Sequence, residues 1–230
     1  MSEPNPETSQ AKLEVYQFYV ELRRVSPAVW RRILMRSDSS IYDLHYTLQL
    51  AFGWSDNHLN RFFIHNKEYG VYKGGGTCFD EDAKQVKLTD LKLRPAQRFW
   101  YEYDFGDRWY HDLRLEKKLP IMPKKIYPIC VTGKGKTPPE DCGGAWAYME
   151  LLREHSLVGI ELRMADILYE IAEGLKEGQD PHFVSYYEEE VQELQQWLEQ
   201  HKNEFDRKAV NLHLRQFALG QEDWWWGLTG

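Results

Sequence analysis

The chain has 230 residues, a formal net charge of -7 and an aromatic fraction of 14%, with nine Trp and fourteen Tyr. This length allows one large domain or one domain with an appendage, and 42% apolar residues are ordinary for a globular protein. This negative net charge excludes the overall positive charge with which many proteins bind the phosphates of nucleic acids. Because no apolar run approaches the roughly 20 residues that cross a bilayer, we expect no membrane span.

The cysteines indicate a reducing compartment. Cys78, Cys130 and Cys142 are an odd number without a CxxC pair, and the first residues carry no apolar signal-peptide core. We therefore expect a cytoplasmic protein. Residues 1–12 are mostly polar and contain two prolines, which predicts a disordered lead-in.

The first folded elements are predicted to be two strands and a helix. Alternating apolar side chains predict strands over residues 16–22 and 30–35, joined by a turn at Ser26 and Pro27. Ser39 or Ser40 then supplies the N-cap of a helix that begins near Ile41 and ends at Gly53.

A return strand is predicted over residues 59–71, and a flexible turn follows it at Lys73–Thr77. This turn is rich in glycine, but it lacks the GxxxxGK[ST] spacing of a phosphate loop. We therefore expect no nucleotide phosphate to bind there.

The clearest pattern is an aromatic hairpin around Gly106–Arg108. Large apolar side chains alternate over residues 99–105 and again over 109–115. A three-residue loop would set Tyr103 opposite His111 and Glu102 opposite Asp112. A slip by one residue would place polar side chains against the aromatic face, so it is disfavoured.

The last third of the chain is predicted to be helical. A strand over residues 127–132 and a loop ending in Pro138–Gly144 come first, and apolar periodicity then predicts four helices, around 145–152, 160–173, 187–198 and 205–217. Strands early and helices late indicate an α+β fold, with a mostly antiparallel sheet, an aromatic core and one early helix packed on the sheet. We expect a core domain over 13–180 and a helical extension packed on it over 181–230.

Three segments carry a resemblance to a known family: GWSDNHLNRF (Gly53–Phe62), YDFGDRWYH (Tyr103–His111) and PPEDCGGAWAY (Pro138–Tyr148). Together they resemble the plasmid pRi-type ORF-three-like family, whose members are also labelled insertion-element passengers under a resolvase-like (TnpR-like) name. The similarity runs from about Leu13 to about Leu214. It implies a compact α+β fold and an association with plasmids and transposable elements, without an agreed reaction.

The pattern of that family falls on positions in all three segments. They are Trp54, His58, Leu59, Asp104, Phe105, Gly106, Asp107, Trp109, His111, Pro138, Pro139, Glu140, Asp141, Gly143 and Gly144.

Two carboxylate-rich loops flank the hairpin, and we predict that they meet in one cleft containing Asp104, Asp107, His111, Glu140 and Asp141. Carboxylates with a neutral imidazole can hold a divalent metal, for which Asp107, His111 and Glu140 are the candidate ligands, or divide general acid and base roles. A structural interpretation stays open. His111 would then satisfy a buried hydrogen bond, and the acidic residues would serve as turn residues or face a helix N-terminus.

Other histidines and cysteines give weaker patterns. Cys130 and Cys142 with His111 form an alternative zinc set, but the cysteines lack the short spacing of structural zinc sites. The remaining histidines in the first part of the chain have no companion at ligand spacing and are expected on a helix face or strand edge: His45, His58 and His65.

Three functions follow from these observations. The absence of a nucleophile constellation, phosphate loop or dinucleotide fingerprint favours a non-enzymatic module that binds a protein, peptide or small ligand, although the sequence leaves open whether the protein is an enzyme. A metal-assisted hydrolase using the cleft residues is the second. A nucleic-acid role linked to mobile elements is the third, if the arginines of the first strands project together as a basic face: Arg23, Arg24, Arg31, Arg32 and Arg36.

The chain ends in a tryptophan-rich tail. Trp224–Trp226 could anchor a partner protein or fold back over the core.

Overall fold

The computed structural model describes residues 13–71, 78–202 and 205–221, and its architecture is α+β, as predicted. The lead-in at 1–12, the glycine-rich run at 73–77 and Trp224–Trp226 lie outside the described residues. The strands are β1 (Glu14–Leu22), β2 (Trp30–Arg36), β3 (Asn60–Ile64), β4 (Lys67–Gly70), β5 (Glu81–Asp82), β6 (Arg98–Tyr103), β7 (Trp109–Pro120) and β8 (Ile129–Lys134). The helices are α1 (Ile41–Phe52), α2 (Gly144–Glu154), α3 (Leu157–Lys176), the 3-10 helix η1 (Pro181–Tyr187), α4 (Glu188–Lys202) and α5 (Arg207–Ala218).

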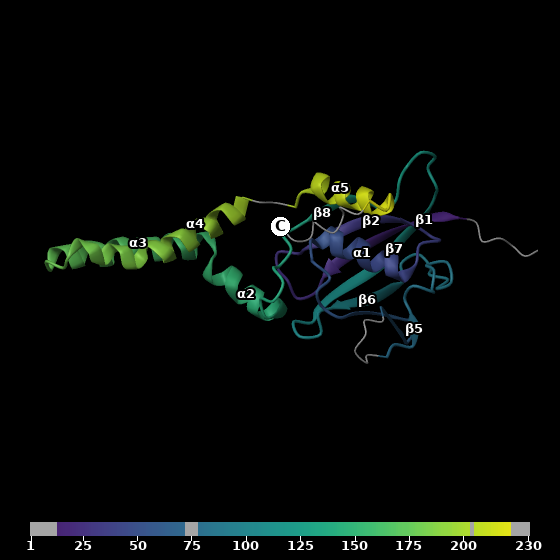
Figure 1. Ribbon diagram of the computed structural model, residues 1–230, viewed down its shortest axis with the longest axis horizontal. Helices are drawn as coiled ribbons and strands as arrows, with labels where there is room; N and C mark the ends of the chain where they lie inside the picture. The colour runs from purple at the N-terminus through teal and green to yellow at the C-terminus, as the bar shows by residue number, and fades with distance from the viewer. Residues whose placement is uncertain (1–12, 72–77, 203–204, 222–230) are drawn as a thin grey trace, which may run out of the picture.

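The strands form one eight-stranded sheet in the order β5-β4-β3-β6-β7-β1-β2-β8. Every described pair of neighbours is antiparallel except β4 with β5. The single return strand expected over 59–71 is instead the hairpin β3–β4, because His65 and Asn66 adopt left-handed backbone angles and turn the chain. Helix α1 packs on the sheet (Figure 1), and their shared apolar side chains form the main core.

Both ends of α1 lie where the sequence predicts them. The Ser40 hydroxyl accepts a hydrogen bond from the Asp43 backbone N–H at 3.0 Å, and the Asp43 carboxylate accepts one from the Ser40 N–H at 2.7 Å. This reciprocal pair is a capping box. At the other end Gly53 adopts a left-handed conformation, with φ 72°, and stops the helix.

The aromatic hairpin is formed by β6 and β7, but its register differs from the prediction by two residues. Tyr103 lies opposite Trp109 and Tyr101 opposite His111, and Asp112 faces Trp100 rather than Glu102. The loop is longer than three residues because Asp104 and Arg108 both adopt left-handed backbone angles and leave the ladder. Since the shift is an even number, every side chain keeps its predicted face.

A helical arm, defined as α3, η1 and α4, projects from the sheet domain beyond α2 (Figure 1). It has its own small core around Ile160, Ile167 and Leu194. A domain boundary at residue 180 stays a prediction, and it falls between α3 and η1 of this arm. Among the described residues, no helix combines the length and apolarity that a membrane span needs.

Helix α5 returns to the sheet and packs against β8 and α1. The Asn211 side chain bonds both backbone groups of Cys130, accepting from its N–H at 2.8 Å and donating to its carbonyl at 2.8 Å. Asn211 thus satisfies both backbone groups of one residue of β8, the last strand of the sheet.

Candidate functional site

Three loops converge at the turn of the β6–β7 hairpin: the loop after α1, the hairpin tip and the segment before α2. The Trp54 indole N–H donates to the Pro138 carbonyl at 3.0 Å, and the Gly143 N–H donates to the Asp107 carboxylate at 3.1 Å. The tip and the proline-glycine segment therefore lie side by side, as the predicted cleft requires.

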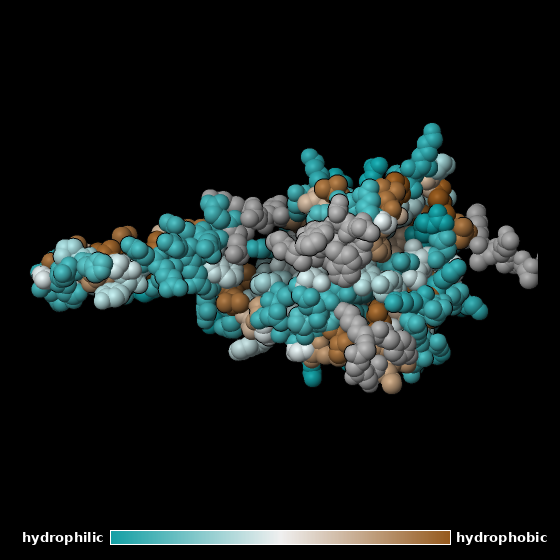
Figure 2. Space-filling model, viewed as in Figure 1, coloured by the Kyte–Doolittle hydropathy of each residue, from teal (hydrophilic) through white to brown (hydrophobic). Residues whose placement is uncertain are grey.

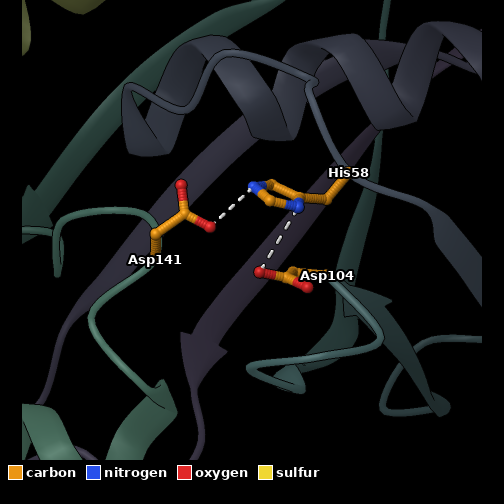
Figure 3. Close-up of side chains that lie close together, drawn as sticks. All are labelled: His58, Asp104 and Asp141. Carbon is orange, nitrogen blue, oxygen red and sulfur yellow. Dashed lines mark ion pairs between the residues drawn. The ribbon is translucent and has the colours of Figure 1, made fainter.

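The loops bring together an imidazole and two carboxylates, the His58 cluster of His58, Asp104 and Asp141 (Figure 3). His58 Nδ1 lies 3.6 Å from Asp104 Oδ2, and His58 Nε2 lies 3.3 Å from Asp141 Oδ1. The side chain of Asp104 is 9% exposed, that of His58 25% and that of Asp141 76%. The cluster is thus closed on the Asp104 side and open to solvent on the Asp141 side.

Asp104 is fixed by the chain around it. Its N–H donates to the Leu59 carbonyl at 2.8 Å, and its Oδ1 accepts from the Gly106 N–H at 2.8 Å. Aspartate tolerates the left-handed angle at this position better than most residues, because its short carboxylate bonds the local backbone. Oδ2 is thereby left to face His58, whose ring packs edge-on against Tyr103.

Glu140 lies beside the cluster, where other donors occupy its carboxylate. Glu140 accepts from the Ser55 hydroxyl at 2.5 Å, from the Ser55 N–H and from the Tyr103 hydroxyl. Burial, reinforced by this hydrogen bond and the Glu140 charge, raises the pKa of Tyr103 above its ordinary value, so the phenol stays protonated and donates. Glu140 thus joins the loops together.

Asp107 joins the hairpin tip to the segment before α2. Its carboxylate accepts from Gly143, and its carbonyl lies so close to Gly144 that a Cβ there would be 2.3 Å from the oxygen. Gly144 also has φ +80°. Only glycine satisfies both constraints without a shift of the backbone.

Gly144→Ala is expected to lower the free energy of unfolding by clearly more than Gly178→Ala, its matched control. Both positions have left-handed angles, which cost an alanine about 1–2 kcal/mol, but nothing lies within 4 Å of a Cβ at Gly178. Urea denaturation of the two variants measures the difference. Equal destabilisation would contradict the tight docking of the two loops.

The structure does not bring His111 into the cluster. His111 is fully buried against the edges of Phe52 and Trp54, and its Nδ1 lies 3.1 Å from the Trp109 carbonyl. Within the described residues Nε2 has no hydrogen-bond partner. Burial lowers the pKa of His111 to about 3, so the ring is neutral.

The alternative zinc set is not assembled either. Cys130 is buried beside Leu50 and Leu214, whereas Cys142 packs against the main core. Over the described residues, the His58 cluster is the only group of three such side chains with ligand atoms within 4.8 Å of one another.

The sequence did not single out His58, because its two partners lie far along the chain. A signal was nevertheless present, since each of the three family-like segments contributes one residue of the cluster. The histidine of the first segment, taken with the carboxylates of the other two, would have indicated it.

Of the five arginines of the first strands, Arg24 is exposed, and the other four bond backbone carbonyls or carboxylates. Arg31 is buried and donates to backbone carbonyls, including that of Ala51 at 2.8 Å. The Arg32 guanidinium donates to the Glu116 carboxylate, with Nε 2.7 Å from Oε2. Arg23 and Arg36 also form ion pairs, with Asp112 and Asp38. The charge needed for nucleic-acid binding on this surface is therefore largely neutralised.

A family model, a curated protein and a solved structure match this chain. The model of the plasmid pRiA4b ORF-3-like protein family matches residues 14–156, a shorter range than the expected Leu13 to Leu214. The uncharacterized protein y4hQ of Sinorhizobium fredii (strain NBRC 101917 / NGR234) is 34% identical over 137 residues, covering 59% of this chain and 70% of that protein. A crystal structure of a protein of unknown function, MM3350 from Methanosarcina mazei Go1, matches with a TM-score of 0.55 and 34% identity, covering 62% of this chain and 81% of that chain. The chain belongs to the plasmid pRiA4b ORF-3-like protein family.

Proposed function

We propose that the protein is a non-enzymatic binding module and that its His58 cluster takes up a divalent cation. The observation that carries this proposal is that both ring nitrogens of His58 face carboxylates. When the imidazole is neutral it has one N–H donor and one lone pair, so one of the two carboxylates then faces a lone pair. A cation between that nitrogen and its carboxylate removes the repulsion.

The spacing on the open side fits such an ion. Zinc bonds imidazole nitrogen and carboxylate oxygen at about 2.0–2.2 Å, which at a tetrahedral angle places the two ligand atoms about 3.4 Å apart. His58 Nε2 and Asp141 Oδ1 are 3.3 Å apart. The two atoms are therefore already at a separation that a shared zinc ion would require.

Asp104 then has the role of orienting the ring. A metal-binding histidine usually donates its second N–H to a carboxylate, which fixes the tautomer and the ring plane. Asp104 Oδ2 lies on the Nδ1 side of His58, where it can accept that proton after a small closure of the 3.6 Å separation. The exposed Asp141 side leaves coordination positions for a carboxylate or phosphate of a bound partner or ligand.

Titration of metal-free protein with Zn²⁺, followed by calorimetry, tests this function. We expect one site per chain, a loss of affinity of about 100-fold or more in His58→Gln, and a loss of about 10–100-fold in Asp104→Asn, which keeps the ligands but removes the orienting charge. His182→Gln, at an exposed histidine outside the site, serves as the matched control and should bind as the original chain does.

Unfolding measurements on each variant separate loss of binding from loss of structure. Absence of Zn²⁺ uptake at millimolar concentration, or equal affinity in His58→Gln and the original chain, would refute the proposal.

Metal-assisted hydrolysis is the second candidate, favoured by the exposure of the Asp141 side. A cation held by two protein ligands keeps open positions at which water can be activated. Hydrolysis of model phosphate esters or peptides that requires Zn²⁺ and His58 would favour this candidate over simple binding. An association with transposable elements stays a prediction.

A further inference from the structure

The helical arm carries an apolar surface that no described part of the chain covers. Helix α3 packs one face on α4 through Ile160 and Ile167, with Leu194 opposite them. At 100° per residue, a second set of side chains lies on the opposite side of α3. This set is the α3 stripe: Val158, Leu162, Ala165, Tyr169, Ala172 and Lys176.

The exposure of the stripe is unusual for a surface helix. Val158, Leu162 and Tyr169 are 64%, 62% and 67% exposed. Leu168, on the border of the stripe, is 68% exposed. Figure 2 shows apolar side chains exposed along the arm. Large apolar side chains that repeat along one exposed helix face are typical of a site of association.

The spacing of the stripe is that of a helix–helix seam. Its members follow one another at intervals of four, three, four, three and four residues, which is the heptad repeat of coiled coils. The repeat extends over nearly the whole of α3, about 27 Å along the axis. An amphipathic helix has one such face, whereas α3 has two.

The sizes of the side chains favour a second copy of α3 as the helix that packs on the α3 stripe. When α3 is paired with a second α3 in antiparallel orientation about its middle, Ala165 lies opposite Tyr169 of the other copy, and Leu162 opposite Ala172. Each large side chain thus meets a small one, as interdigitated packing requires. Parallel pairing would place Tyr169 on Tyr169 and leave a gap between the two Ala165 side chains.

The charges at the ends of the stripe favour the same orientation. Antiparallel pairing sets Lys176 opposite Val158 of the other copy, one helical turn from Glu161. The Lys176 ammonium now lies 2.5 Å from Glu173 of its own helix, but an exposed pair of this kind contributes little and can exchange partners. Parallel pairing would bring the two Lys176 ammonium groups together.

We propose that the α3 stripe is a self-association surface, on which a second copy of this chain docks its own α3 in antiparallel orientation. A single helix seam is smaller than the roughly 800 Å² per partner of a standard stable interface, so the dimer dissociates in the micromolar range. The His58 cluster lies outside this seam, and dimer formation is independent of cation binding.

Sedimentation velocity of the full chain in EDTA, from about 1 to 500 μM, tests the proposal; this range brackets micromolar affinity. We expect a concentration-dependent dimer that is weakened at least tenfold by Leu162→Glu, since the change places a charge in the seam of both copies. Met122→Glu is the matched control, because Met122 is 50% exposed but lies outside the arm, and it should dimerise as the original chain does. A monomer throughout this range, or an unchanged dimer in Leu162→Glu, overturns the proposal.

Two charge variants test the orientation. Glu161→Lys and Lys176→Glu should each weaken the dimer by about three- to tenfold, because two like-charged contacts replace two attractive ones. An equimolar mixture should regain the original affinity, since the mixed dimer pairs opposite charges at both ends. A mixture no tighter than the separate variants overturns antiparallel docking.

Discussion

Trp109→Ala is expected to lower the free energy of unfolding by about 3–5 kcal/mol, the range for truncation of a large buried aromatic side chain. Trp109 is fully buried, and its ring lies 5.8 Å from that of Trp54 and 6.5 Å from that of Tyr148. Its indole N–H has no partner among the described residues, so the loss arises from packing and not from a hydrogen bond. Trp109 thus packs β7 against the loop after α1 and against helix α2.

Urea denaturation followed by circular dichroism measures this loss, with Trp146→Ala as the matched control. Trp146 is 79% exposed, and its removal should change the free energy of unfolding by no more than about 0.5 kcal/mol. A cost below about 1 kcal/mol for Trp109→Ala would show that the loops can close over the cavity, and would contradict a rigid support for the His58 cluster.

Acidification is expected to destabilise the protein through His111. Burial lowers the pKa of this residue from 6.5 to about 3 in the folded chain, whereas the unfolded chain protonates it near the ordinary value. Between these two values the unfolded state binds more protons, so the free energy of unfolding falls as the pH falls, by up to about 1.4 kcal/mol per pH unit. Well above pH 6.5 His111 is neutral in both states, so its titration no longer changes the free energy of unfolding.

Urea denaturation at intervals from pH 7.5 to pH 4 tests the titration of His111. His111→Met removes the ionisable group from the core, and its stability should depend less steeply on pH than that of the original chain. His182→Gln, at an exposed position, should keep the original slope. If the slopes of His111→Met and the original chain coincide, another group is responsible for the acid sensitivity.

The parts of the fold that depend on residues close together in the sequence could be predicted from it. The limits of α1 are set by Ser40 and Gly53, which act on the backbone within one turn. The faces of β6 and β7 follow from strict alternation. Their register does not, because a shift by two residues leaves every face unchanged and depends on the backbone angle of Asp104, which alternation cannot report.

The candidate site was predicted in outline only. The meeting of the hairpin tip with the segment before α2 follows from where the carboxylates are concentrated, and Asp104 and Asp141 do lie together. The sequence pattern favours His111 over His58 as the imidazole, because burial is a property of the folded chain that the pattern does not report. His111 lies on the core face of β7, whereas His58 comes from a loop whose position depends on contacts distant in sequence.

The helical arm shows a further limit of sequence patterns. Periodicity located α3 and α4 but did not show that α3 has apolar side chains on two opposite sides. The side chains of one side pack inside the arm, and those of the other side form the proposed dimer seam. Only the arrangement of the helices distinguishes the two.

The contact between Asn211 and β8 has a consequence for the integrity of the sheet. A terminal strand with vacant amide and carbonyl groups is a template on which foreign strands add, which leads to aggregation. Here an asparagine on α5 occupies both groups of Cys130, as a neighbouring strand would. Helix α5 therefore protects this part of the edge strand from pairing with another chain. A chain shortened before residue 207 would expose the Cys130 backbone groups to other molecules.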